Sequence, residues 1–210
     1  MNIDFLKLLM DRTKFPQQAQ EAYLQAAEKI DADSMDGAIE FYYENDFSAK
    51  QTQPLIEEMA NDSSVNVYTV WGLFLAFAAE RAHRDYLAEG ISEEVFFETF
   101  SDLRYKTLEC KENKGVFGNF VAFWYPIFYS CDIVKLGRLE YETRTFGENE
   151  RAIPGMDIRP GQKFLNIHIP SSGEPFDKAA RLESYKLAYD FFKELRGEGP
   201  LVCMCHSWLL

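Results

Sequence analysis

The chain is poor in positive charge and in cysteine, and each shortage excludes a class of protein. Its 210 residues hold 22 Lys and Arg against 34 Asp and Glu, a net charge of −12. Proteins that bind nucleic acid neutralise phosphates with Lys and Arg, so we expect no nucleic-acid partner. Only four cysteines are present, too few and too scattered for a disulfide framework. A reducing, cytoplasmic location is expected.

The sequence also lacks segments suited to a membrane or to export. Its most apolar run, from Val65 to Ala79, is short of the roughly 20 residues that span a bilayer. The first five residues include an acid and no basic segment, which argues against a signal peptide. We therefore expect no membrane partner.

The composition that remains is that of a globular chain, with 47% apolar and 27% charged residues. Its charge is uneven. Residues 1–110 carry nine Lys and Arg against twenty-one Asp and Glu, whereas residues 111–210 carry thirteen of each. This shift predicts two domains, an acidic one over 1–110 and a neutral one over 111–210 that could accept an anionic ligand.

The front half has the apolar spacing of helices. Pro54 is expected to open one helix, and Asp33-Ser34 to cap another. The segment 65–89 is apolar all round, which is typical of the buried central helix of a bundle. The polar segment 111–115 ends in Gly and is the expected hinge between the two domains.

The back half changes to the pattern of strands. Residues from Asp132 to Thr143 alternate like a strand, and a short strand is predicted over 164–169. A helix is predicted over 176–196, followed by a last strand over 201–207. A helix that connects two strands of one sheet makes them parallel, so the carboxyl ends of both strands should meet at one edge.

That edge gathers the candidate site residues. His168 and His206 end the two strands, and a His that titrates near neutral pH suits a general base. The start of the helix offers N–H groups to an anion. The candidate anion-binding residues beside it are Ser171, Ser172, Gly173, Lys178 and Arg181.

Structural roles compete with each of these assignments. Either His could bond backbone at a strand end, and the two Ser could be turn and cap formers. Arg138 and Glu140, on one face of the predicted strand, are expected to form an ion pair rather than to act in catalysis. Strand alternation places His206 on the face opposite Cys203 and Cys205, so no metal site is expected.

Four motifs carry a resemblance to a known family. They are 90–103, Leu136–Tyr141, Asn166–Pro170 and Cys205–Leu210. The chain resembles bacterial acyltransferases that have a helical N-terminal domain and a GNAT-like C-terminal domain. The resemblance implies an α+β fold, in which a helical bundle precedes a mixed α/β sheet. It also implies acyl-CoA or acetyl-CoA as donor, a small-molecule amine or similar nucleophile as acceptor, and no metal.

One departure from the family pattern keeps a second function open. The loop Pro170–Pro175 lacks the Arg/Gln-x-x-Gly-x-Gly/Ala signature that binds pyrophosphate in GNAT proteins. The alternative is a non-catalytic binding or scaffold protein. A GNAT-like sheet would also need strands beyond Leu210, so we expect a truncated domain whose exposed last strand could pair with another chain.

Overall fold

The computed structural model describes residues 1–147, 160–196 and 202–205. They form two compact units, Met1–Cys131 and Asp132–Leu210. The division thus falls after Cys131, not at residue 110. The expected hinge 111–115 instead completes a helix that ends at Lys114, and Gly115 caps it in the left-handed conformation with φ of +77°.

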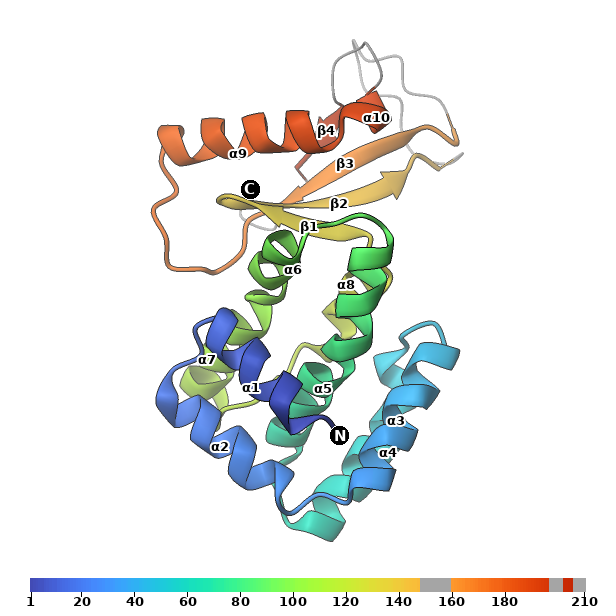
Figure 1. Cartoon of the computed structure of the whole chain (residues 1–210), viewed down its shortest axis with the longest axis vertical. Coiled ribbons are helices and arrows are strands. Elements are labelled where there is room, and N and C mark those ends of the chain that lie inside the picture. The colour runs from blue at the N-terminus through green and yellow to red at the C-terminus, as the bar shows by residue number, and fades with distance from the viewer. Residues whose placement is uncertain (148–159, 197–201, 206–210) are drawn as a thin grey trace. The chain divides into compact units, whose positions relative to one another are not determined.

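The first unit is built of helices in its described residues (Figure 1). Their bounds are α1 (Ile3–Arg12), α2 (Gln17–Ala27), α3 (Ala32–Glu44), α4 (Ala49–Ser63), α5 (Val67–Ala88), α6 (Glu93–Phe100), α7 (Asp102–Lys114), the 3-10 turn η1 (Ala122–Trp124) and α8 (Pro126–Tyr129).

The central helix of this unit is α5, as the sequence predicts. Thirteen of its 22 residues are buried, and helices on several sides pack against it. The side-chain oxygen of Asn66 caps its start by accepting from the N–H of Tyr68 at 2.9 Å. Within the described ranges, α5 included, we find no helix with the length and apolarity that crossing a membrane requires.

Two expected helix starts lie elsewhere. Ser48 caps α4, so Pro54 lies inside that helix rather than at its beginning. Asp31 caps α3, because its carboxylate accepts from the N–H of Ser34 at 2.8 Å. A capping side chain must reach the N–H of the second or third residue of its helix. The local composition alone does not show that Asp31, rather than Asp33 or Ser34, meets this requirement in α3.

The second unit contains a mixed sheet. Its strands are β1 (Ile133–Leu136), β2 (Leu139–Thr145), β3 (Lys163–His168) and β4 (Cys203–Met204), in the order β1-β2-β3-β4. The first two pairings are antiparallel and the last is parallel. The alternating stretch from Asp132 is therefore two strands joined at Gly137 and Arg138. Gly137 has φ of +66°, which favours glycine.

A helix connects the two parallel strands. It is α9 (Lys178–Phe191), followed by the short α10 (Lys193–Arg196), where the sequence predicts one helix over 176–196. The parallel pairing joins Leu165 with Cys203 and Asn166 with Met204, so the predicted strand–helix–strand arrangement is confirmed. In Figure 1, α9 lies along one face of the sheet.

Candidate functional site

His168 ends β3, and the carboxylate of Glu142 holds its ring there. Its Nε2 lies 2.8 Å from Oε2 of Glu142. Nδ2 of Asn166 donates to the same Oε2 at 2.9 Å and lies 3.1 Å from Nε2 of His168. A carboxylate only accepts hydrogen bonds, so Nε2 carries the proton that points to Glu142. In the neutral ring, Nδ1 then holds the lone pair that can take up a proton.

Strand register explains why these three residues meet. Asn166 and His168 are two apart on β3 and share a face, and Glu142 lies directly opposite Asn166 on β2. Glu140 lies opposite His168 on the same face, and Lys135 lies opposite Glu140. Asn166, Glu140 and Lys135 are buried. A charged and polar row therefore runs across this face of the sheet.

Glu142 is charged at neutral pH. Burial by itself would raise the pKa of its carboxyl, but the hydrogen bonds from His168 and Asn166 outweigh burial and lower the pKa below its usual value. The side chains of Glu142 and His168 are 16% and 17% exposed. In this half-buried setting a carboxylate fixes both the tautomer and the orientation of an imidazole.

The other face of the sheet is covered by α9. Ser184 donates to the carbonyl of Leu136 and accepts from the hydroxyl of Tyr141 at 2.8 Å, and all three groups are buried. Burial raises the pKa of Tyr141 to about 12, so its hydroxyl keeps the proton that it donates. This chain of hydrogen bonds fixes α9 against β1 and β2.

Arg138 connects the turn between β1 and β2 to the loop after β3. Its Nη1 donates to the carbonyl of Pro170 at 3.0 Å, and its Nε donates to the carbonyl of Glu174 at 3.2 Å. Arg138 is 9% exposed. The expected strand position beside Glu140 is wrong, because Arg138 lies in the turn and bonds backbone carbonyls of the loop.

The loop residues Ser171, Ser172 and Gly173 follow directly after β3, at the same strand end as His168. Ser171 is exposed, and Oγ of Ser172 accepts from the N–H of Glu174 at 3.2 Å, which is the turn-forming role that competes with anion binding. Gly173 has φ of +74° and supplies a left-handed residue to the turn.

Two cationic residues begin α9. Lys178 is its first residue and is exposed, and Nε of Arg181 donates to the carbonyl of Asp177 at 3.3 Å. Arg138 and Arg181 each place their guanidinium carbon 5.3 Å from the ring centre of Phe176. The carboxylate of Asp177 caps the helix by accepting from the N–H of Ala180 at 2.9 Å. The start of this helix therefore carries both cationic side chains and an acidic cap.

His206 lies outside the described residues, so only one of the two predicted imidazoles can be placed. Cys203, in β4, and Cys205 are free thiols. Across the three described ranges, no three His, Cys, Asp or Glu side chains gather as metal ligands do.

Sequence reasoning did not single out Glu142 as a partner of His168. The signal that could have found it is the pair Asn166 and His168, whose spacing puts both on one strand face. Glu142 joins them only through the register of the hairpin, which depends on the turn at Gly137. The strand-like alternation continues on both sides of Gly137, so the pattern did not predict that turn.

Solved structures with the same fold are acyltransferases. One is an acyltransferase mutant in complex with octanoyl-CoA, with a TM-score of 0.68 and 21% identity. Another is an acyltransferase in complex with CoA and 10C-teicoplanin, with a TM-score of 0.67 and 20% identity. Both alignments cover 97% of this chain and 61% of the other, so the chain spans about three-fifths of these structures. A search of curated proteins found no match.

Family models account for nearly the whole sequence. The model described as N-acyltransferase N-terminal domain matches residues 4–131, and the model described as GNAT-like C-terminal domain matches residues 133–210. The break between the two matches coincides with the division between the two compact units. The α+β architecture, a helical unit followed by a GNAT-like mixed sheet, is that of these acyltransferases. The chain belongs to the N-acyltransferase family that the first of these domains defines.

Proposed function

We propose that this chain takes part in transferring an acyl group from an acyl-CoA thioester to an amine of a small molecule. The observation that carries the proposal is the end of β3. There Glu142 holds the ring of His168 by a hydrogen bond, and Arg138 bonds the loop that follows the strand. This loop leads into the helix that starts with Lys178. The acyl-CoA complexes of the similar structures support this donor class.

His168 is the proposed general base. An amine attacks a thioester only as the neutral form, so an ammonium acceptor must first lose a proton. With Nε2–H directed to Glu142, Nδ1 of His168 takes that proton. The amine nitrogen then bonds to the acyl carbon, the carbon–sulfur bond of the thioester breaks, and the CoA thiolate leaves with the proton that the nitrogen loses as the amide forms. Glu142 acts as a positioning residue, because it holds the ring and stabilises the imidazolium that forms. His206 remains the second proposed base from the sequence.

The proposed phosphate-binding residues lie on the loop and on the first turns of α9. Ser171, Ser172 and Gly173 would offer hydroxyl and backbone N–H groups to the donor, and Lys178 and Arg181 would offer charge. Because Asp177 already occupies one N–H of the helix start, the cations must carry more of the binding than in a loop with the GNAT signature. The donor supplies the activated acyl carbon, and these residues orient it.

A direct assay incubates the chain with acetyl-, octanoyl- or decanoyl-CoA and an amine acceptor such as teicoplanin. The acylated product is measured by mass spectrometry, since the protein's own free thiols would react with a reagent that detects released CoA. His168→Ala is expected to lower the rate about 10²-fold or more, as loss of a general base does. An unchanged rate in His168→Ala removes that residue from the mechanism.

Glu142 needs a variant that separates positioning from folding. Glu142→Gln keeps the shape and a hydrogen-bond acceptor but removes the charge, so kcat should fall about tenfold while KM for the donor stays constant. Glu142→Asp, which keeps the charge, serves as the conservative comparison. Equal kcat values for Glu142→Gln and the unaltered chain would exclude the carboxylate from proton transfer.

A non-catalytic binding protein is the second candidate, and the acidic cap Asp177 favours it, because a carboxylate at the helix start opposes a diphosphate. Thermal unfolding with CoA and acetyl-CoA discriminates between the two. A ligand that binds only the folded state raises Tm, so donor binding predicts a rise that Lys178→Ala and Arg181→Ala diminish. The absence of any rise at millimolar donor would favour the non-catalytic function.

A further inference from the structure

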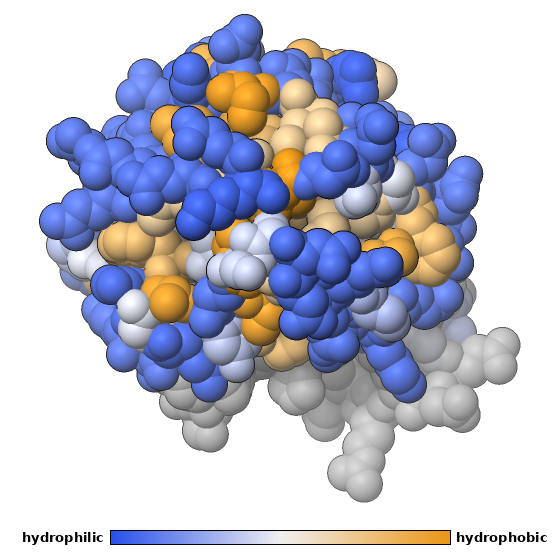
Figure 2. Space-filling view, turned by 90° about the horizontal axis from the view of Figure 1, so that it is seen from below, coloured by the Kyte–Doolittle hydropathy of each residue, from blue (hydrophilic) through white to orange (hydrophobic). Residues whose placement is uncertain are grey.

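A groove of about 470 Å³ runs between α3 and α4 in the helical unit, and none of the candidate site residues lines it. Its floor is apolar and is made by Ala38 and Phe41 of α3 and by Leu55 and Met59 of α4. Binding sites for small molecules have volumes of about 300–1,000 Å³ and mostly apolar walls. Figure 2 shows a largely hydrophilic surface on the side it views, with apolar residues between the hydrophilic ones.

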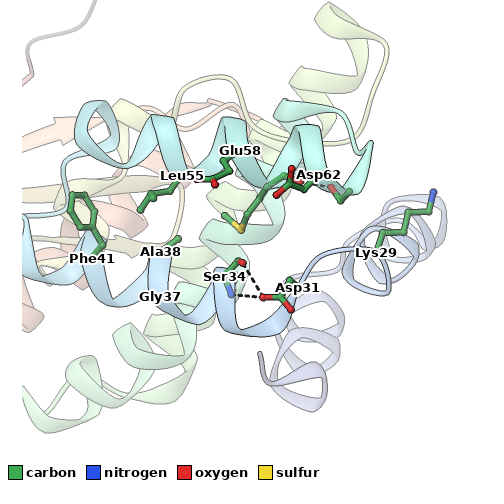
Figure 3. Close-up of a pocket in the computed structure, with 11 residues that line it drawn as sticks. Lys29, Asp31, Ser34, Gly37, Ala38, Phe41, Leu55, Glu58 and Asp62 are labelled. Atoms are coloured by element: carbon green, nitrogen blue, oxygen red, sulfur yellow. Dashed lines mark hydrogen bonds between the residues drawn. The ribbon is translucent and has the colours of Figure 1, made fainter.

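The acids of the lining are spread unevenly along this groove. Asp31 and Asp62 line one end, Phe41 lines the other, and Glu58 lies between them next to Leu55 (Figure 3). The pKa of Asp31 is lowered by hydrogen bonds from the backbone N–H and the hydroxyl of Ser34, so its carboxylate stays charged. Lys29, the one cation of the lining, lies in the turn after α2, and in Figure 3 its amine points away from Asp31 and Asp62.

Gly37 keeps the floor of the groove open. It lies inside α3, where glycine lowers helix stability relative to alanine. A Cβ atom at this position would meet nothing within 4 Å, so no packing inside the chain requires a glycine here. Any larger side chain at residue 37, which is exposed in the groove, would occupy the space between the two helices.

We propose that this groove binds a primary alkylamine, with its ammonium between Asp31 and Asp62 and its alkyl chain over Gly37 toward Phe41. Ten residues of helix separate Asp31 from Phe41, a length of about 15 Å. Roughly ten to twelve carbons with bonds of about 1.5 Å extend over that distance. The acidic, net-negative helical unit attracts a cation and repels a fatty acid of the same length.

The distribution of charge selects a small amphiphile over a docked basic helix. A basic helix docked along the groove would carry cations over its whole length. A groove suited to it would have acids on both rims along that length. Here two of the three acids, Asp31 and Asp62, stand at one end and Phe41 stands at the other, which matches one charged head and one apolar tail.

Calorimetric titration with n-decylamine, below its micelle concentration and at neutral pH, tests the proposal on the full chain. Saturable one-to-one binding is expected, with decanoate showing none at the same concentration. Gly37→Leu should weaken binding at least tenfold by filling the floor, whereas Gly37→Ala should retain most of it. Both substitutions are expected to raise Tm, which shows that a loss of binding is not a loss of folding.

A second pair of variants tests the charged end of the groove. Asp62→Asn should weaken n-decylamine binding about two- to fivefold, the range for exposed ion pairs. Glu57→Gln, on the same helix and outside the groove, should leave it unchanged. Three results would each overturn the proposal. Decanoate binds as tightly as n-decylamine, Gly37→Leu leaves the affinity for n-decylamine unchanged, or a basic amphipathic peptide binds and n-decylamine does not.

Discussion

Replacing Ser184 with Ala tests how α9 is held on the sheet. The hydroxyl of Ser184 links the carbonyl of Leu136 and the hydroxyl of Tyr141, and all of these groups are buried. The substitution leaves a buried donor and a buried acceptor without partners, each at a cost of about 1–1.5 kcal/mol, the low end of the range for an unsatisfied buried group. We therefore expect the second unit to lose about 2–3 kcal/mol of stability.

Hydrogen exchange followed by mass spectrometry reads this loss in the second unit alone. At about 1.4 kcal/mol per factor of ten, peptides from β1 and β2 should exchange roughly 30- to 150-fold faster, while peptides from α5 keep their rates. Tyr141→Phe is the matched control. It leaves the bond from Ser184 to Leu136 intact, so its cost should be only about 1 kcal/mol. If Ser184→Ala cost no more than Tyr141→Phe, the bridging role of this hydroxyl would be refuted.

Three further predictions concern the helical unit. Gly118→Ala should destabilise it by about 1–3 kcal/mol in urea unfolding, because the new Cβ would overlap the backbone of Tyr68, and a wild-type midpoint would contradict this. Asn66→Ala should lower the free energy of unfolding by about 1 kcal/mol in the same assay, because it removes the cap of α5. An unchanged free energy would show that water replaces the cap. Burial lowers the pKa of His83, so the unfolded chain binds its proton first as pH falls below about 6.5. Thermal melts should therefore show stability declining below that pH, less so in His83→Gln; parallel curves would exclude His83.

Elements whose pattern is uniform were predictable from the sequence. Residues 70–79 of α5 are apolar on every side and buried, and a segment of that kind is stable only in the middle of a bundle. The parallel pair β3 and β4 followed from two short strands separated by a helix, because such a connection leaves few other topologies.

Features that depend on distant contacts were not predictable. The aromatic segment before Cys131 reads equally as helix or strand, and long-range bonds assign it to the helical unit. The hydroxyl of Tyr125 donates to Asp102 at 2.9 Å, and that of Tyr129 donates to the carbonyl of Leu75 at 2.6 Å. The domain boundary therefore lies beyond residue 110. Likewise, His168 was visible as a strand-end residue, whereas its partner Glu142 depends on register.

The parallel pairing of β3 with β4 has a consequence for how the chain reaches its folded form. Leu165 and Cys203 meet although thirty-eight positions separate them in sequence, whereas α3 and α4 pack after a link of only four residues. Contacts between near neighbours form fast, and closing a long loop is slow. A ribosome that releases the chain from its amino end would therefore let the helical unit mature first. The loop that follows β3 would acquire its final geometry last.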